Sequence, residues 1–265
     1  MNFEGKVALI TGGGNGIGRA TALAFATHRA KVVVVDHDGA SAERVAATIK
    51  QQGGDALSIT ADVTKSADVA AYVKETLDAH GRIDIFFNNA GIEGKIAKTA
   101  EYDEEVFDKV IAVNLKGVFL GLRHVLPAML EQGTGAIVNT ASVAGVVGTP
   151  GMPAYCASKH AVIGMTKVAA GEVARNGIRV NAVCPGPIDT RMIHSIEGQI
   201  DPDDPEAVNA RYQASLPTGR YGTVEEIANT VLFLSSDLAS NITGAQYVVD
   251  GGRTAIGGAV TSGAR

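Results

Sequence analysis

The chain has 265 residues, a hydrophobic share of 46% and a charged share of 19%, a composition that excludes a largely disordered protein. Its net charge is −5 and no stretch is rich in lysine or arginine, so we expect no nucleic-acid partner. We expect no signal peptide, because the first apolar run is short and leads directly into a glycine-rich turn. We also expect no membrane span, because the uncharged stretch 132–158 is interrupted by Pro150 and Pro153.

The cysteines and histidines do not show the spacing of a metal site. Cys156 and Cys184 form no metal or redox motif, and we expect both to be small buried side chains in a reducing compartment. The six histidines are scattered, without the paired spacing of histidine metal sites. The sequence therefore predicts a cytoplasmic protein with no bound metal.

The most informative segment runs from residue 6 to residue 36. An apolar strand at 7–10 leads into a glycine-rich turn, a helix follows at 19–27, and a strand at 32–35 ends in Asp36. This order is typical of the first unit of a dinucleotide-binding fold, where glycines let the backbone approach a pyrophosphate and the acid accepts hydrogen bonds from a ribose. The candidate cofactor residues of the turn are Gly12, Asn15, Gly16, Ile17 and Gly18.

The glycine spacing of this turn differs from the common G-x-G-x-x-G. It reads T-G-x-x-x-G-I-G from Thr11 to Gly18. Glycine turns also close ordinary strand–helix units that bind no ligand, so the turn alone leaves both interpretations open. The rest of the chain has to decide between them.

Helices and strands continue to alternate almost to the end of the chain. Strands rich in valine and isoleucine, with helices between them, predict an α/β fold: a single-domain doubly wound (Rossmann) parallel sheet of about seven strands, covered on both faces. We place this domain at 1–252, including a substrate lid at 192–216, and a C-terminal tail at 253–265. The other helices are expected at 41–52, 66–81, 103–132, 155–175 and 223–235, and the other strands at 56–60, 83–87, 136–139, 179–183 and 247–249.

Two of these helices, 103–132 and 155–175, are apolar nearly all round. Such a helix needs cover on both sides. One alternative is a helix buried deep inside a monomer, but helices of such a sheet form its outer layer. We therefore expect a partner subunit, and thus a homo-oligomer.

Tyr155 and Lys159 are four residues apart, which places them on one face of a helix. Lowering the pKa of a tyrosine from about 10 to about 7 requires about 4 kcal/mol. One ammonium group ~4 Å away, at an effective dielectric constant of ~20, supplies about that much. We therefore expect Tyr155 to act as a general base near neutral pH, with Ser142 donating a hydrogen bond to the substrate oxygen.

A set of motifs in this order resembles the short-chain dehydrogenase/reductase family over residues 6–252. They are T-G-G-G-N-G-I-G at 11–18, Asp62 with Val63, N-N-A-G at 88–91, Asn114, Ser142, Y-C-A-S-K at 155–159 and P-G-P-I-D-T at 185–190. The resemblance implies an acid/base role for Tyr155, a tuning and ribose-binding role for Lys159, substrate orientation by Ser142 and a proton-relay water on Asn114. It also implies contacts to the nicotinamide cofactor from Asp62, Val63, Asn89, Ala90, Gly91, Pro185, Gly186, Ile188 and Thr190, and a tetrameric assembly.

Asp36 favours NAD over NADP, because a carboxylate accepts a hydrogen bond from a ribose 2′-hydroxyl and repels a 2′-phosphate. We therefore expect an NAD-dependent alcohol dehydrogenase or ketone reductase. One alternative is a 3-oxoacyl-carrier-protein reductase, which usually goes with NADPH and a basic docking patch. Another is a non-catalytic NAD-binding regulator, but such family members usually lose the tyrosine or the lysine.

The segment 192–216 is the expected substrate lid. Asp204 and Pro205 have the signature of a helix start, and Val208, Tyr212 and Leu216 then recur every four residues. A solvated loop is the alternative interpretation. Because the loops expected to face the lid are apolar, we expect a pocket for a hydrophobic or cyclic secondary alcohol. The candidate substrate residues are Ser142, Val143, Met152, Tyr155, Gly186, Met192 and Tyr212.

Overall fold

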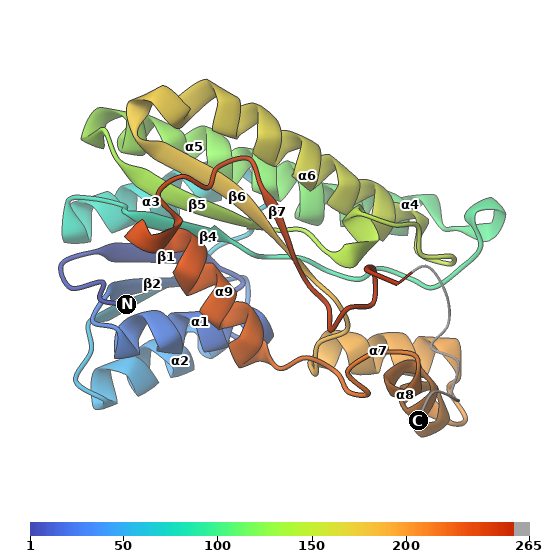
Figure 1. Cartoon of the computed structure of the whole chain (residues 1–265). Coiled ribbons are helices and arrows are strands. Elements are labelled where there is room, and N and C mark those ends of the chain that lie inside the picture. The colour runs from blue at the N-terminus through green and yellow to red at the C-terminus, as the bar shows by residue number, and fades with distance from the viewer. Residues whose placement is uncertain (257–265) are drawn as a thin grey trace.

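The computed structural model describes residues 1–256, which form a seven-stranded, fully parallel sheet with helices on both faces (Figure 1). The strand order is β3-β2-β1-β4-β5-β6-β7. The fold predicted from the sequence is thereby confirmed. The predicted tail 253–265 lies outside the described residues from 257 onward.

The elements follow the chain as a regular alternation. The strands are β1 (Val7–Thr11), β2 (Lys31–Asp36), β3 (Ala56–Thr60), β4 (Ile85–Asn88), β5 (Gly135–Thr140), β6 (Ile178–Pro185) and β7 (Gln246–Val249). The helices are α1 (Gly16–Thr27), α2 (Gly39–Gln51), α3 (Ser66–His80), α4 (Glu104–Ile111), α5 (Gly117–Gln132), α6 (Pro153–Val173), α7 (Arg191–Ile200), α8 (Pro205–Ala214) and α9 (Val224–Ser235). Short 3₁₀ turns lie at Thr99–Glu101, Val143–Gly145, Ala174–Asn176 and Asp237–Ala239.

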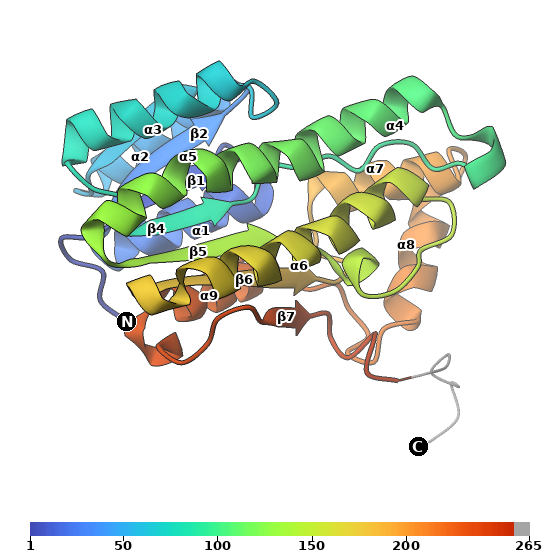
Figure 2. The same cartoon turned by 90° about the horizontal axis from the view of Figure 1, so that it is seen from above.

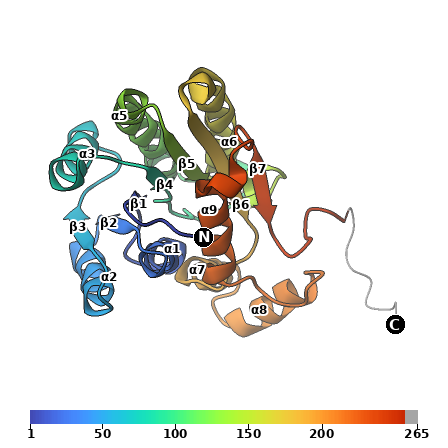
Figure 3. The same cartoon turned by 60° about the vertical axis from the view of Figure 1, so that its left-hand side comes forward.

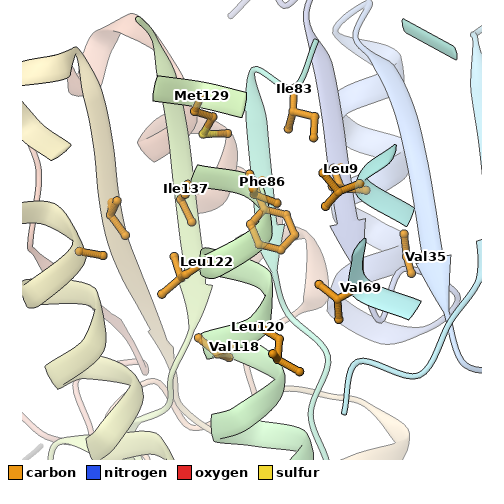
Figure 4. Packing of buried hydrophobic residues seen from close by; sticks show 14 of the residues in the cluster. Leu9, Val35, Val69, Ile83, Phe86, Val118, Leu120, Leu122, Met129 and Ile137 are labelled. Carbon is orange, nitrogen blue, oxygen red and sulfur yellow. The ribbon is translucent and has the colours of Figure 1, made fainter. Parts of the chain in front are cut away.

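Alternate residues of each strand point to opposite faces of the sheet, and both faces are apolar. Leu9 of β1 and Phe86 of β4 point to one face, where α3, α5 and α6 cover them (Figures 3 and 4). Ile10 and Phe87, the next residue in each strand, point to the other face beneath α1, α2 and α9. Two apolar cores therefore fix the strand register, because a one-residue slip would exchange them.

The predicted helix 103–132 differs from the structure in its middle. It consists of α4 and α5 joined by one π-helical turn, Ala112–Lys116, which contains Asn114. By length and composition alone, the combined stretch Glu104–Gln132 could cross a membrane. Its inner face instead packs on the sheet through Val118, Leu122 and Val125, as a long core helix does.

The crevice of the fold lies where the strand order reverses, between β1 and β4. In open parallel sheets, ligands bind at the carboxyl ends of the strands at this switch point. Helices α7 and α8 lie beyond those ends, apart from the two helical layers (Figure 2). The α8 helix starts where its sequence predicted, with Asp204 as its N-cap. The α7 helix was not predicted.

Candidate active site

The glycine turn after β1 is built for close backbone approach. Gly12 and Gly16 have φ angles of +62° and +50°, which side chains rarely tolerate. A Cβ atom on Gly18 would lie 2.0 Å from the carbonyl oxygen of Gly12, so the helix start and the turn touch there. Asn89 ties this turn to β4, because its side-chain amide donates to the carbonyl oxygens of Thr11 (3.1 Å) and Gly12 (3.3 Å).

Asp36 at the end of β2 is held by two backbone donors. Its carboxylate accepts hydrogen bonds from the amide of Gly14 (2.9 Å) and from the amide of Asp38 (3.0 Å). The imidazole of His37 lies 3.7 Å from the same carboxylate and is largely exposed. The acid is therefore fixed beside the glycine turn, where the ribose of a bound dinucleotide would lie.

Asn114 is fully buried and braces the loop after β4. Its side-chain oxygen accepts from the amide of Ile92 (2.8 Å), and its amide donates to the carbonyl oxygen of Ile92 (2.9 Å) and to the Ser158 hydroxyl (3.3 Å). The π turn brings this side chain to α6. Such turns occur often at functional sites. A Cβ on Gly91 would lie 3.3 Å from the Asn114 side-chain oxygen and 3.5 Å from the Lys159 ammonium, so these predicted residues are neighbours.

Tyr155 and Lys159 lie one helical turn apart on α6, as their spacing predicts. The ammonium of Lys159 is buried, donates to the Thr140 carbonyl oxygen (2.7 Å) and lies 5.6 Å from the centre of the Tyr155 ring. Burial lowers the pKa of Lys159 to about 8, so the charged form still prevails at neutral pH. This charge therefore faces the ring of Tyr155 and the end of β5.

The expectation that Lys159 brings the pKa of Tyr155 to about 7 is wrong for this arrangement. Burial raises the pKa of Tyr155 to about 12, and a hydrogen bond with Ser142 opposes the increase only in part. The Lys159 ammonium donates to the carbonyl oxygen of Thr140 and lies 5.6 Å from the centre of the Tyr155 ring. Desolvation of the phenolate is the largest influence on the pKa of Tyr155 in the protein.

Ser142 follows β5 and faces Tyr155 across the crevice. Its hydroxyl accepts from the amide of Ala144 (3.1 Å) and lies 3.5 Å from the carbonyl oxygen of Pro185. Ser142 has an extended backbone and is the N-cap residue of the short turn Val143–Gly145. Val143 is the first residue of this turn and is buried.

The segment after β6 closes the crevice from the other side. The Thr190 hydroxyl donates to the carbonyl oxygen of Ile188 (3.1 Å), and a Cβ on Gly16 would lie 3.7 Å from the Thr190 methyl group. The loop after β6 is therefore next to the glycine turn. In the loop after β3, Asp62 accepts hydrogen bonds from the amide (3.0 Å) and the hydroxyl (2.7 Å) of Thr64. These bonds lower the pKa of Asp62.

The lid contains a polar network that the sequence analysis missed. Glu197 of α7 is buried and accepts hydrogen bonds from the Tyr221 hydroxyl (2.6 Å) and the Asn209 amide (2.9 Å). Burial alone would raise the pKa of Glu197, but hydrogen bonds from Tyr221, His194 and Asn209 hold it below its usual value. His194 bridges Glu197 (2.8 Å) and Asp189 (2.9 Å), and its bond to Glu197 raises its pKa. The two lid helices are thus joined through one buried carboxylate.

An apolar cluster joins the lid helices α7 and α8 to Met152 and Tyr155. Its buried members include Met152, Ile193 and Leu216, and the half-buried Tyr155 and Tyr212 pack against it. The candidate substrate residues from α6, α7 and α8 therefore meet in one place. Gly186 is the turn beside them, with its amide donating to the Val249 carbonyl oxygen (2.9 Å).

The arrangement fits a dinucleotide. Gly18 and Gly12 are in close contact, and Asp36 is fixed beside them, so backbone lines the start of α1. The first backbone N–H groups of α1 have no partner within the helix and can bind a phosphate. The adenosine end of a bound dinucleotide would lie at Asp36 and Asp62, and the other end of the dinucleotide would lie near Lys159. Tyr155 and Ser142 then stand where an alcohol oxygen can be bound and deprotonated.

The chain is similar in sequence and in structure to proteins that are named as reductases and dehydrogenases. Residues 12–254 match the family model described as enoyl-(acyl carrier protein) reductase. Levodione reductase from Leifsonia aquatica is 46% identical over 255 residues, which cover 96% of each chain. A crystal structure of levodione reductase superimposes with a TM-score of 0.94 at 45% identity, and the match covers 96% of this chain and 99% of that one. Cyclohexanol dehydrogenase from Acinetobacter sp. (strain SE19) is 44% identical over 252 residues, covering 95% of this chain and 96% of the relative. The structure of NAD⁺-bound xylitol dehydrogenase has a TM-score of 0.91 at 37% identity, covering 95% of this chain and 100% of that one.

Proposed function

The chain belongs to the short-chain dehydrogenase/reductase family and is a nicotinamide-dependent oxidoreductase of alcohols and ketones, and we propose that it uses NAD and acts on a hydrophobic or cyclic secondary alcohol. A bound nicotinamide supplies the hydride acceptor for alcohol oxidation. Within the chain, Ser142 holds the substrate oxygen and Tyr155 accepts its proton. Lys159 provides a buried positive charge beside the tyrosine ring.

The observation that carries the substrate proposal is the apolar cluster that includes Tyr155. Met152, Ile193 and Leu216 are buried against it, and the half-buried Tyr212 of α8 packs on the same cluster. Burial of apolar substrate surface in such a pocket is favourable at about 25 cal/mol per Å². The name of the relative cyclohexanol dehydrogenase, which specifies a cyclic secondary alcohol, supports the same class.

We expect Tyr212→Ala to raise KM for a cyclic alcohol about tenfold and to leave the affinity for NAD nearly unchanged, because the ring packs on the apolar cluster beside Tyr155 and not on the glycine turn. The measurement is steady-state oxidation of a panel containing cyclohexanol, linear secondary alcohols, xylitol and a sugar phosphate. A clear preference of the wild type for xylitol or the sugar phosphate would contradict the substrate proposal.

The choice of NAD rests on Asp36, whose carboxylate is fixed by Gly14 and Asp38. Asp36→Ala removes a ribose acceptor and the charge that repels a 2′-phosphate. We expect the kcat/KM ratio of NAD to NADP to fall at least tenfold. Asp36→Asn is the matched control, because it removes the charge and keeps an acceptor oxygen. A wild type that already prefers NADP would refute the proposal.

A carrier-protein-linked ketone is the second candidate substrate, because the matching family model is described as an acyl-carrier-protein reductase. This alternative usually goes with NADPH, which Asp36 disfavours. A reductase assay with an acyl group on carrier protein and on a free thioester separates the two candidates. Activity that depends on the carrier protein would favour the alternative.

We also propose a homotetramer, because the outer faces of α4, α5 and α6 carry exposed apolar side chains. Phe119 is 46% exposed, Val168 is 61% exposed, and Phe107 is 37% exposed. Exposed apolar surface of this kind is typical of a subunit interface. Light scattering of a tetramer gives about four times the chain mass of 27.2 kDa, and we expect Phe119→Asp to give a smaller species. A wild-type mass near 27.2 kDa at micromolar concentration would contradict the proposal.

A further inference from the structure

Glu93 is a buried carboxylate that the chemistry described above does not use. It lies in the loop after β4 and is only 9% exposed. Within residues 1–256 its side chain makes no hydrogen bond and no ion pair, unlike the buried carboxylates Asp84 and Glu197. The Glu93 carboxylate therefore has no partner within the described residues and is available to a hydrogen-bond donor of a ligand.

The loop that carries Glu93 is fixed on three sides by groups of the site. Ile92 is held by Asn114. On the lid side, Gln199 of α7 accepts from the amide of Ile96 (2.9 Å) and donates to the carbonyl oxygen of Gly94 (3.3 Å). On the third side, the amide of Ala97 donates to the carbonyl oxygen of Gly151 (3.0 Å), one residue before Met152. Glu93 therefore lies in a loop that is fixed between Asn114, the lid helix α7 and the segment before α6.

Two observations place the Glu93 carboxylate near Tyr155 and in contact with solvent. Its negative charge is close enough to contribute to the raised pKa of Tyr155. Its oxygens are also absent from the buried, unpaired polar atoms of the described chain, so they keep access to solvent. The neighbouring side chains of Ile96 and Met152 are apolar and belong to the same cluster as Tyr155.

We infer that Glu93 is a specificity-determining residue that accepts a hydrogen bond from a second hydroxyl group of the substrate, so that the preferred substrate is a diol or hydroxyketone and not a simple alcohol. This inference rests on the proposed function and narrows its substrate class. A carboxylate forms strong hydrogen bonds with hydroxyl donors and has none to offer a carbonyl group. An apolar pocket with one acceptor therefore distinguishes a hydroxyketone from the corresponding diketone.

The test compares three ketones that share one ring: cyclohexanone, 4-hydroxycyclohexanone and cyclohexane-1,4-dione, with the corresponding 1,3-compounds as a second series. In the wild type, we expect kcat/KM for a hydroxyketone to exceed that for the corresponding diketone at least tenfold. In Glu93→Leu, the ratio of kcat/KM for hydroxyketone to that for cyclohexanone should fall at least tenfold, mainly through KM. Glu101→Gln, on the same segment but exposed, is the matched control and should keep the wild-type ratio.

Three other outcomes would overturn the inference. Equal losses on all three ketones, with a shifted pH profile, would mean that Glu93 acts only through its charge on Tyr155. A selective loss of NAD⁺ affinity would mean that the carboxylate pairs with the cofactor. An unchanged substrate ratio in Glu93→Leu would mean that it binds no substrate hydroxyl. If the wild type reduces none of these ketones, the proposed function itself fails, whereas turnover of cyclohexanone without any hydroxyl preference refutes only the inference.

Discussion

Tyr155→Phe is expected to reduce kcat for alcohol oxidation about 10³-fold while the dissociation constant for NAD stays within about threefold, since general acid–base groups contribute about 10²–10⁴-fold. The substitution removes only the hydroxyl that we propose as the acceptor of the substrate proton. The ring, which lies beneath Lys159 and packs on the apolar cluster, stays in place. Steady-state kinetics and calorimetric NAD titration measure the two quantities separately.

Tyr247→Phe is the matched control for this substitution. Tyr247 lies in β7, and its hydroxyl makes no hydrogen bond within the described residues, so turnover should be unchanged. A Tyr155→Phe enzyme with a substantial fraction of wild-type turnover would contradict the acid–base assignment.

The direction of the pH dependence follows from the same group. Burial raises the pKa of Tyr155 to about 12, so the neutral phenol dominates at physiological pH in the protein alone. Alcohol oxidation needs the phenolate, and its kcat/KM should rise with pH. Ketone reduction needs the phenol, and its kcat/KM should fall as pH approaches the pKa of Tyr155. Both slopes should disappear in the residual activity of Tyr155→Phe.

The sequence predicted those parts of the fold that depend on local patterns. Strand β3 has the predicted bounds, and α9 begins after Thr223, whose hydroxyl accepts from the amide of Glu226 while the Glu226 carboxylate accepts from the amide of Thr223. The helix start at Asp204 was also predicted correctly. The two helix-start signals are each contained within four residues, so no tertiary contact is needed to recognise them.

The features that were missed depend on contacts distant in sequence. The π turn at Ala112–Lys116 has ordinary helix-compatible residues, and it is fixed by the bonds of Asn114 to Ile92 and Ser158. The burial of Glu197 likewise depends on Tyr221 and Asn209. Neither arrangement has a local sequence signal.

Helix α7 is different, because a local signal existed. Ile193, Ile196 and Ile200 recur at helical spacing, and the first two are buried in the apolar cluster of the lid. The sign of the pKa shift of Tyr155 was missed for another reason. The spacing of Tyr155 and Lys159 predicts their proximity, but not that the ammonium donates to Thr140.

Gly18→Ala is expected to weaken NAD binding at least tenfold and to lower the free energy of unfolding by about 1–3 kcal/mol, the usual cost of inserting a methyl group into a filled space. The added Cβ would lie 2.0 Å from the carbonyl oxygen of Gly12 and 2.9 Å from the Asn89 amide. The first contact is with backbone, so no side-chain rotation relieves it. The turn and the start of α1 must separate, and the N–H groups that would face a pyrophosphate are displaced. NAD titration and thermal unfolding measure the two effects.

Gly198→Ala is the matched control, because it adds the same methyl group to a helix without this collision. Gly198 lies in α7, and a Cβ there meets no atom within 4 Å. Alanine in place of a helical glycine stabilises by about 0.4–1 kcal/mol, so this variant should unfold at a higher temperature and keep its NAD affinity. Wild-type NAD affinity in Gly18→Ala would show that the turn does not hold the pyrophosphate. A loss of stability without a loss of NAD affinity would show that the contact of Gly18 with Gly12 supports folding but not NAD binding.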